Sequence, residues 1–535
     1  MTRSLKQIAL VVTCGTLISK IGGLTRQLVI AGAFGVGAAY DAYNYAYVLP
    51  GFFLILLGGI NGPFHNSIVS VLSRKTKKEG AYILSVINTF VSALLIFITA
   101  IILLAADPLI SIIGPGLAPD IHQIAVMQLK FMAPITLLSG FIGLGFGSLN
   151  ANDEFLIPAI SPFISSLIII IFVGGFWLYE DSILESNKLE IIGGIILGIA
   201  TLIGAFLQWI IQIPTLISKG LTRLNLVWDL RHPGVREVMK IIGPATLASG
   251  MLQINVFTDL FFASEIVGAA AGLSYANFLV QAPLGLISNG LLIPLIPTFS
   301  KLTNPNDREN LISRIRQGIM LSSASMIILG AILIALAMPI VTLVYARGAF
   351  ETNATKLVAE LLIAYGVGMP TYLGRDLLVR VFYALGDGVT PFRLSAIGIV
   401  LNIFFDWFLV GGPSPWGNQL SFNFGATGLV LATVAINLIT CLALLMKLNS
   451  RLGGLPLNEW ALDGLKLLFA GVAAGFIAWS ISSVLNWPNE FLSLLIEVSL
   501  SISTSLFVFF LLGTAMNVKE VKELIILIRQ RIIRL

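Results

Sequence analysis

Charged side chains inside long apolar segments are the residues of this chain that could do chemistry. Residues 19–51, SKIGGLTRQLVIAGAFGVGAAYDAYNYAYVLPG, place Lys20, Arg26 and Asp41 in or beside sequence long enough to cross hydrocarbon. A Lys, Arg or Asp at the centre of a membrane helix costs at least about 2.5–3.5 kcal/mol, so such groups usually face a bundle interior or a water-filled cavity. The alternative, a cation that reaches back to the membrane surface, fits Arg26 better than Lys20, which lies near mid-depth.

A second pair of cations lies in the segment TYLGRDLLVRVFYALGD, which carries Arg375 and Arg380. Asp376 precedes Arg380 by four residues, the favourable order for an ion pair on one helix face. Arg375 is therefore the freer cation of the two.

Four oxygen-bearing residues at similar predicted depth form a candidate ion site: Asp259, Asn402, Asp406 and Thr433. Asn402 and Asp406 are four residues apart and share a helix face. Carboxylate, amide and hydroxyl oxygens suit a hard monovalent cation, here Na⁺, or a proton. The alternative is that each acid bonds a neighbouring helix or is protonated.

Two uncharged pairs also share helix faces within apolar segments. Asn277 lies with Gln281, and Asn61 lies with His65. Their side chains could hydrogen-bond sugars, but hydrogen bonds between helices are the interpretation that we favour.

Several function classes are excluded by what the sequence lacks. It contains no Walker A loop, no Cys/His metal spacing and no serine nucleophile elbow. Its two cysteines, Cys14 and Cys441, lie in apolar runs and most simply pack there. We therefore expect neither an enzyme nor a resident cofactor.

The composition is that of a polytopic membrane protein. The chain has 535 residues, of which 57% are hydrophobic and only 11% charged, against about 25% charged in soluble proteins. Apolar runs long enough to span hydrocarbon begin near residues 7, 43, 81, 123, 156, 191, 238, 272, 316, 357, 390, 424, 465 and 491. The sequence thus predicts an all-α fold of fourteen transmembrane helices.

The distribution of cations predicts the orientation. Most of the 32 Lys and Arg fall in alternate loops and in the tail. Because cytoplasmic loops carry the excess of Lys and Arg, both termini are expected in the cytoplasm. This distribution also explains the net charge of +5 without a nucleic-acid partner.

An internal repeat predicts the domain organisation. YAYVLPG at 45–51 recurs as YANFLVQAPLG at 275–285, and SLNANDEFLIPAISPF at 148–163 is echoed by YALGDGVTPFRLSAI at 383–397. The offset equals six spans, which predicts two pseudo-symmetric six-helix lobes with substrate between them. The expected parts are an N-lobe at 1–218, an amphipathic cytoplasmic linker at 219–240, a C-lobe at 241–450, two further helices at 451–516 and an amphipathic cytoplasmic tail at 517–535.

The tail, NVKEVKELIILIRQRIIRL, has apolar residues at helical spacing together with cations. This pattern is typical of a helix that lies on the inner leaflet. We interpret it as an anchor, with a lipid-sensing role as the alternative.

Taken together, the chain resembles the MurJ (MviN) family of lipid II flippases, in the multidrug/oligosaccharidyl-lipid/polysaccharide exporter superfamily. The resemblance covers nearly the full length. It is carried by SKIGGLTRQ and GVGAAYDAY within 19–43, NANDEFLIPAISP at 150–162, IGPATLASGMLQINVFTD at 242–259, LIPTFSKL at 295–302, VYARGAFE at 344–351 and FYALGDGVTPFR at 382–393.

The resemblance implies roles for particular positions. Ser19, Lys20, Arg26 and Asp41 would handle the headgroup, with Lys20 where an arginine is common; Arg380 would match an arginine before the FYAL motif. Asp259, Asn402, Asp406 and Thr433 would be the family's sodium site, and the two additional helices would line a groove for the polyprenyl tail.

The chain departs from the family where paired arginines are common. Leu54 and Ile55 occupy those positions, Asn61 stands where a glutamate is usual, and Asn277 with Phe278 replaces an Asp-Arg pair. The missing arginines are cations that would hold a pyrophosphate.

The leading hypothesis is a flippase of the bacterial inner membrane. It would move an undecaprenyl-pyrophosphate-linked cell-wall precursor to the periplasmic leaflet by alternating access, driven by membrane potential, sodium or both. We expect a monomer in contact with membrane lipids and with the cell-wall synthesis machinery. The alternatives are export of another lipid-linked oligosaccharide or amphipathic solute, and a non-transporting membrane scaffold.

Overall fold

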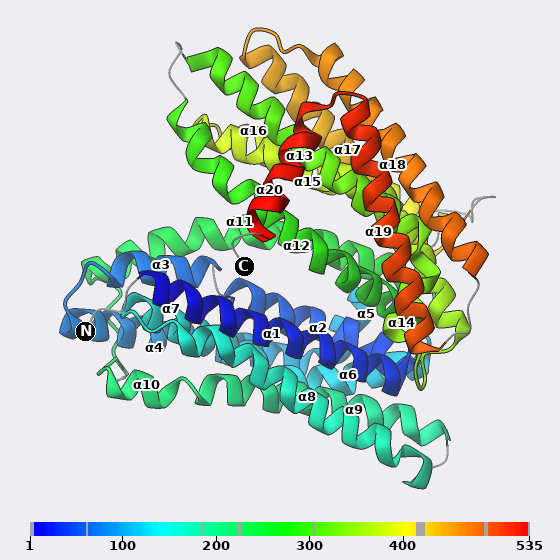
Figure 1. Cartoon of the computed structure of the whole chain (residues 1–535). Helices are drawn as coiled ribbons and strands as arrows, with labels where there is room; N and C mark the ends of the chain where they lie inside the picture. Colours follow the sequence, from blue (N-terminus) through cyan, green and yellow to red (C-terminus); the bar gives the residue numbers. More distant parts are fainter. Residues whose placement is uncertain are drawn as a thin grey trace. The chain divides into compact units, whose positions relative to one another are not determined.

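The computed structural model describes residues 5–59, 62–183, 186–221, 226–302, 307–412, 423–485 and 490–532, and all regular structure in them is helical. The all-α prediction is confirmed for this part of the chain (Figure 1). The helices are α1 (Leu5–Phe34), α2 (Ala38–Leu56), α3 (Pro63–Leu72), α4 (Lys77–Leu104), α5 (Ala106–Ile113), α6 (Pro119–Met132), α7 (Ile135–Ala151), α8 (Leu156–Ile183), α9 (Ser186–Ile210), α10 (Ile213–Ser218), α11 (Pro233–Ala263), α12 (Ala269–Lys301), α13 (Arg308–Ala335), α14 (Ala337–Tyr345), α15 (Thr352–Ala384), α16 (Val389–Leu409), α17 (Ala426–Arg451), α18 (Leu457–Leu485), α19 (Phe491–Ala515) and α20 (Lys519–Ile532).

Ten helices within the described residues are long and apolar enough to cross a membrane. The pair α6 and α7, bent by 42° at its break, makes an eleventh when counted as one span. The long helix α1 carries Lys20 and Arg26, α2 carries Asp41, and α11 carries Asp259. The polar residues of interest thus lie on three long helices of the N-terminal half of the chain.

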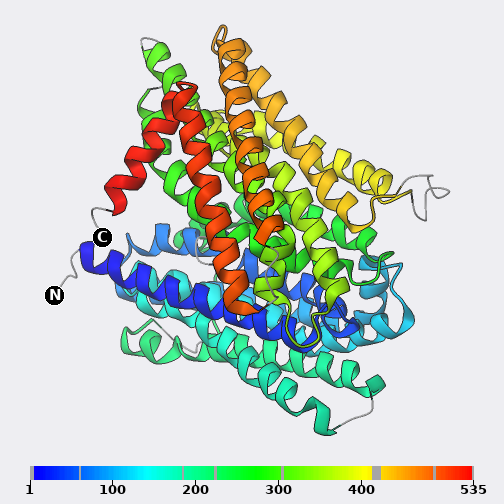
Figure 2. The same ribbon diagram turned by 45° about the vertical axis from the view of Figure 1, so that its right-hand side comes forward.

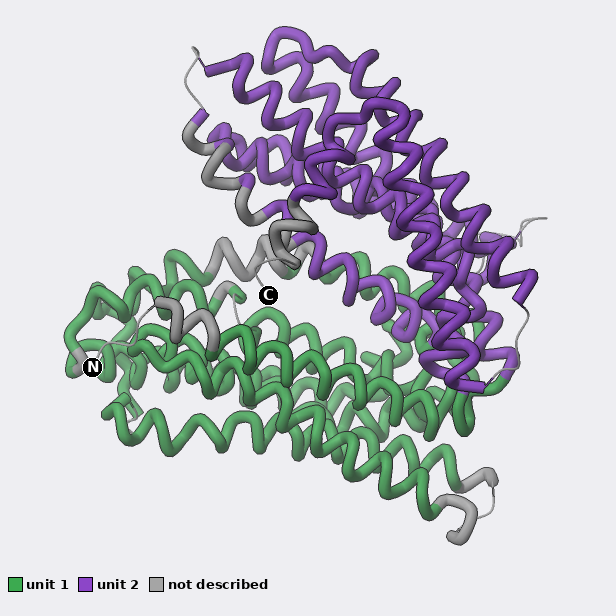
Figure 3. The backbone as a smooth tube through the Cα atoms, viewed as in Figure 1, with its two compact units in different colours: residues 1–271, 347–351 green, residues 272–346, 352–535 purple. Residues whose placement is uncertain are grey.

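The chain divides into two compact units (Figure 3). Unit 1 comprises residues 1–271 and 347–351, and unit 2 comprises residues 272–346 and 352–535. Helix α11 belongs to unit 1 because it packs against α2, α3, α4 and α5. The six-helix lobes predicted from the repeat stay a prediction.

Unit 1 is built around α2 and α7. Helix α2 packs against α6, α7, α9 and α11, whereas α7 packs against α3, α4 and α9. The core they enclose includes the fully buried Tyr45, Ile68 and Phe146. Helix α1 packs on α8, which in turn packs on α9. Because backbone groups in hydrocarbon must be paired within their own segment, long helices are the expected result of these apolar runs.

The segment 347–351 within the VYARGAFE motif is held to the end of α1. The Ala349 N–H donates to the Gly32 carbonyl oxygen at 2.8 Å. Gly348 has a positive φ of 57°, and a Cβ there would lie 2.3 Å from the same Gly32 oxygen. Only glycine fits this close approach without strain.

The predicted linker at 219–240 is partly irregular and partly helical. Residues 226–232 have no helix, and Pro233 begins α11. Proline is favoured at the first position of a helix, where its missing N–H costs nothing. Residues 233–240 are therefore the first turns of α11.

Unit 2 is organised by α13 and α15. Helix α13 packs against α15 and α18, and α15 packs against α17, which contacts α16. Helices α18 and α19 lie side by side, orange and red in Figure 2. Small residues of α18 also face α13: Gly471 meets Ile327 and Gly475 meets Ala331, the close approach typical of membrane helices.

The GDGVTP sequence between α15 and α16 forms a hydrogen-bonded turn. Asp387 accepts from the Thr390 N–H at 3.0 Å and from the Thr390 hydroxyl at 2.8 Å. These bonds, together with the Arg451 guanidinium at 2.8 Å, hold the pKa of the Asp387 carboxyl below its usual value. The turn thereby connects the end of α17 to the start of α16.

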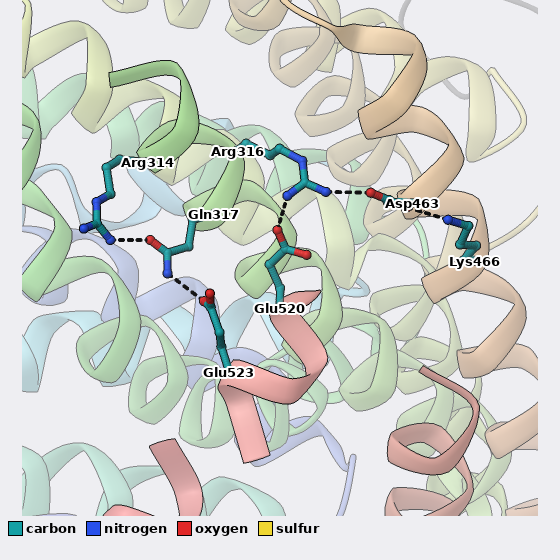
Figure 4. A network of polar contacts seen from close by, with 7 residues as sticks. All are labelled: Arg314, Arg316, Gln317, Asp463, Lys466, Glu520 and Glu523. Atoms are coloured by element: carbon teal, nitrogen blue, oxygen red, sulfur yellow. Dashed lines mark hydrogen bonds and ion pairs between the residues drawn. The ribbon is translucent and has the colours of Figure 1, made fainter. Parts of the chain in front are cut away.

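The C-terminal helix α20 is attached to unit 2 by polar contacts (Figure 4). Arg316 on α13 forms an ion pair with Glu520 on α20 and another, at 2.6 Å, with Asp463 on α18. Gln317 donates to Glu523 at 2.6 Å. Glu520 is only 3% exposed, so its charge depends on Arg316 for compensation.

We expect Arg316→Ala to lower the free energy of unfolding by about 2–4 kcal/mol, because it leaves the buried Glu520 without its cation. Chemical denaturation of the purified protein in detergent measures this effect. The matched control is Arg314→Ala, which removes an exposed arginine of the same helix whose partner is the neutral Gln317 and should cost less than about 0.5 kcal/mol. Equal effects of the two substitutions would contradict the proposed attachment.

Candidate functional site

The predicted first-helix residues lie on α1 with different exposure. Ser19 is half-buried and Lys20 is exposed, whereas Arg26 is half-buried. Gly22, between the two cations, packs directly on the Phe163 ring. The Arg26 Nε is buried and makes no hydrogen bond with a described residue. The Arg26 Nε is therefore a donor that a ligand could use.

A row of tyrosines on α2 lies beside Arg26 and was missed by the sequence analysis. Tyr40, Tyr43 and Tyr47 stack in succession, with ring centroids 5.9 and 5.3 Å apart. Arg26 lies close enough to Tyr43 and Tyr47 to act on both electrostatically. The spacing of three and four residues, which places all three rings on one helix face, was the signal for this row.

Two hydrogen bonds fix the tyrosine row in unit 1. Gln27 Nε2 on α1 donates to the Tyr40 hydroxyl at 2.8 Å. The Thr201 hydroxyl on α9 donates to the Leu197 carbonyl oxygen at 2.7 Å, so the Tyr43 hydroxyl donates to Thr201 at 3.2 Å. The Arg26 guanidinium and the Tyr47 phenol are then the donors of this surface that suit phosphate and sugar oxygens.

Asp41 lies on α2, is only 1% exposed, and contacts the first residues of α12. Its Oδ1 accepts from the Ala271 N–H at 3.0 Å, and the backbone N–H groups of Gly268 and Ala270 also bond to it. A carboxylate at this position pairs the free N–H groups of a helix start and complements the helix dipole. Asp41 therefore caps α12, and its predicted headgroup role stays a prediction.

The predicted cations of α15 differ in their partners. Arg375 donates to Asn437 Oδ1 at 3.2 Å and to the Ser395 hydroxyl at 3.4 Å, so it connects α15 with α17 and α16. Arg380 is half-buried further along α15. Arg375 is therefore less free than the sequence indicated, and the adjacent Asp376 carboxyl acts on its charge as well. Asn277 and Gln281 on α12 are both exposed.

Three of the four predicted ion ligands lie on two facing helices of unit 2. Asn402 donates to Asp406 at 2.6 Å on α16, and both side chains are almost fully buried. Gly428 on α17 meets Leu409 of α16, and Gly398 meets Ile436. This register places Thr433 within about one turn of Asp406. Asp259 lies on α11 in unit 1.

These donors fit a hard monovalent cation by chemistry, since all are oxygen atoms and one is an acid. Among the described residues no group of three or more His, Cys, Asp or Glu could hold a metal ion. A site here would thus rely on amide and hydroxyl oxygens beside a carboxylate.

Asn61 lies outside the described residues. Its predicted neighbour His65 is buried on α3 and is hydrogen-bonded to Asn150 of α7 at 2.6 Å. This contact connects two helices, which is the structural alternative given for the pair.

Comparison with known proteins places the chain among membrane transporters. Residues 30–497 match the sequence profile of the family described as "Lipid II flippase MurJ". The chain is 46% identical over 519 residues to the "Probable lipid II flippase MurJ" of Synechocystis sp., covering 96% of this chain and 95% of that protein. It is 25% identical to the corresponding protein of Vibrio cholerae, covering 96% and 98% of the two chains.

Solved structures show the same fold. The structure titled "Lipid II flippase MurJ, inward closed conformation" superposes with a TM-score of 0.75 at 23% identity, covering 95% of this chain and 98% of that one. An inward-facing multidrug resistance MATE family transporter of the MOP superfamily gives a TM-score of 0.61 at 17% identity, with coverage of 83% and 98%.

The capping role of Asp41 predicts a specific order of stabilities. Asp41→Ala should lower the free energy of unfolding by about 1–2 kcal/mol, the usual cost of losing a helix cap. Asp41→Asn should lose less, because its amide oxygen still accepts from the Ala271 N–H. Denaturation of the purified protein measures both.

The control for Asp41 is Asp120→Ala, which removes an exposed acid from the first turn of α6 and should change stability by less than about 0.5 kcal/mol. If Asp41→Asn were as unstable as Asp41→Ala, the capping assignment would be wrong.

Proposed function

This chain belongs to the MurJ family, and on that basis we propose that it is a lipid II flippase of a bacterial inner membrane. The observation that carries the proposal is the 46% identity to a probable lipid II flippase over 96% of the chain. The family consists of transporters rather than enzymes, in agreement with the expectation from the sequence. The substrate is then lipid II, whose movement across the membrane supplies peptidoglycan synthesis.

The physical task is to carry a polar headgroup through hydrocarbon while the tail stays in lipid. A pyrophosphate cannot enter hydrocarbon unaided, because an isolated charge there costs many kcal/mol. Lys20 and Arg26 would attract the pyrophosphate, and the phenol of Tyr47 would donate to a phosphate or sugar oxygen. Arg375 and Arg380 would contribute further positive charge, with Asn277, Gln281 and Asn61 as neutral partners for the glycan.

Alternating access is the transport mode that we propose. The sequence repeat supports two six-helix lobes with substrate between them, and fourteen spans with both termini cytoplasmic follow from the apolar runs and the cation distribution. The two additional helices would guide the lipid tail. Neither an oligomer nor contact with the cell-wall machinery is required by this mechanism, and we propose a monomer that delivers substrate to that machinery.

Membrane potential would favour export of the headgroup. Moving roughly two negative charges outward across about 100 mV gains on the order of 4–5 kcal/mol, at about 2.3 kcal/mol per charge. Inward Na⁺ bound by Asp259, Asn402, Asp406 and Thr433 would then reset the empty carrier. Such a cycle needs ion binding that favours one state by a few kcal/mol.

One observation favours a second candidate, export of another lipid-linked oligosaccharide. Leu54 is half-buried and Ile55 is 58% exposed on α2, where the family commonly carries arginines. A substrate with less phosphate charge would need fewer cations. The complementation experiment below separates the two candidates.

Expression of the chain in a strain depleted of its lipid II flippase tests the substrate. We expect the wild type to restore growth, and we expect Lys20→Ala or Arg26→Ala to reduce plating efficiency by at least about tenfold, because each loses a charged hydrogen bond of about 1.5–3 kcal/mol. The matched control is Lys130→Ala, which removes an exposed lysine from α6. Immunoblots must show equal membrane levels of all variants.

Failure of a well-inserted wild type to restore growth would overturn lipid II as substrate and favour the other lipid-linked glycans. Rescue by every variant would instead contradict the headgroup roles of Lys20 and Arg26.

The sodium proposal makes a separate prediction. Thermal unfolding of the purified protein should occur about 1–2 °C higher in NaCl than in equimolar KCl, because a bound ion stabilises the folded state. Asp406→Asn should abolish this difference, whereas Asp376→Asn, which neutralises an exposed acid on α15, should preserve it. Equal melting of the wild type in the two salts would exclude a sodium site of this kind.

A further inference from the structure

A cavity of about 510 Å³ lies within unit 1, away from the residues assigned to transport. It is enclosed by α4, α7, α9 and α10. Its volume falls in the range of about 300–1,000 Å³ that is typical of ligand sites. We therefore asked which ligand its wall would accept.

The cavity lies beside a helix break between α9 and α10. Pro214 has no N–H to donate to Ile210, so the helical hydrogen-bond pattern is interrupted between these helices. Next to the break, Gln212 packs so close to α7 that a Cβ on Gly145 would lie 2.0 Å from its side-chain oxygen. Ile213 and Trp209, on either side of this contact, line the cavity.

The wall is mostly apolar, with Trp209 stacked on Phe141 at 5.2 Å, and its polar side chains are Ser85, Ser148 and the exposed Asn88. Among the described residues no acidic or basic side chain lines it. The hydroxyls of Ser85 and Ser148 donate to the carbonyl oxygens of Ala81 and Leu144, so their protons are already in use. A pyrophosphate would find no cation here among the described residues, and a sugar would find only the Asn88 amide to replace its water, whereas a hydrocarbon chain needs no such replacement.

The cavity adjoins surface that would face lipid. Its enclosing helices include the membrane-length segments Lys78–Leu104 and Leu189–Ser218. Ile217 lines the cavity and is itself 61% exposed, and the neighbouring Ile210 is also exposed. In a bilayer the cavity would therefore open toward lipid.

Trp228, in a segment that is hydrogen-bonded to α4, marks the level at which the polar part of such a lipid would lie. The Val227 N–H donates to the Thr89 hydroxyl at 3.2 Å, and the Tyr82 hydroxyl donates to Asp229 at 3.0 Å. These bonds fix the segment around Trp228, which is 66% exposed. Tryptophan is enriched at the membrane interface, the level at which a phospholipid's glycerol lies.

We propose that this cavity binds one acyl chain of a membrane glycerophospholipid, held as a structural lipid of unit 1. The site is distinct from the polyprenyl groove expected at the C-terminal helices. It does not depend on the transported substrate, so its test needs no transport assay.

Photo-crosslinking tests the proposal on the full-length protein in phospholipid nanodiscs. The probe is a phosphatidylcholine that carries a diazirine in one acyl chain, and adducts are located by peptide mass spectrometry. We expect adducts at Leu144 and Leu216, two buried wall residues, at several times the yield found at Phe97, which is exposed on α4.

A matched pair of substitutions locates the lipid. Ile213→Trp fills the cavity and should reduce the Leu144 and Leu216 adducts roughly fivefold or more while Phe97 is labelled as before. Ile210→Trp makes the same change on the exposed surface and should preserve all adducts. If the Ile213 variant does not fold, the ratio of Leu144 and Leu216 adducts to Phe97 adducts in the wild type still tests the proposal.

Two results would overturn the proposal. The first is labelling of Phe97 in the wild type without adducts at Leu144 or Leu216. The second is displacement of the cavity adducts by undecaprenyl phosphate but not by an equal amount of unlabelled phospholipid, which would identify the occupant as a prenyl chain.

Discussion

The cost of placing a charge in hydrocarbon is the constraint on which the rest of this structure depends. Each polar residue within a long helix needs a partner, since water is absent from the bilayer core. Asp41 meets this need with the backbone N–H groups at the start of α12. Asn402 and Asp406 are hydrogen-bonded to each other on one helix face, and His65 is hydrogen-bonded to Asn150. Much of the polarity that first indicates function therefore also holds helices together.

Arginines illustrate how partners separate structural from functional roles. Arg316 is bound by two carboxylates, one of them buried, so its charge is compensated and its role is to hold α20. Arg375 donates to the neutral Asn437 and Ser395, with the exposed Asp376 carboxyl next to it, so its charge is less fully compensated than that of Arg316. Arg26 has phenols nearby and a buried Nε that makes no hydrogen bond with a described residue. The more weakly an arginine is compensated, the stronger is its attraction for a phosphate.

Local pattern predicted much of the fold, because hydrocarbon makes hydropathy a strong signal. The apolar runs predict the long helices, and the spacing of apolar residues predicts α20 as a helix. Local pattern did not predict the partner of a side chain where that partner is distant in sequence. Nothing near Asp41 in sequence indicates that Ala271 is its partner, and nothing near Arg375 indicates Asn437. The tyrosine row was predictable from its spacing, but its proximity to Arg26 required the packing of unit 1.

The tyrosine row bears on the question raised by Leu54 and Ile55. A site with fewer cations binds a pyrophosphate less tightly, but a flippase must also release its substrate. Charged hydrogen bonds contribute about 1.5–3 kcal/mol each, whereas neutral ones contribute about 0.5–1.5 kcal/mol. Replacing arginines by phenols would therefore lower the affinity while keeping donors for phosphate and sugar oxygens. In this view Arg26 attracts the phosphate and Tyr47 adds a neutral donor, so that loss of the paired arginines is compatible with transport of the same headgroup.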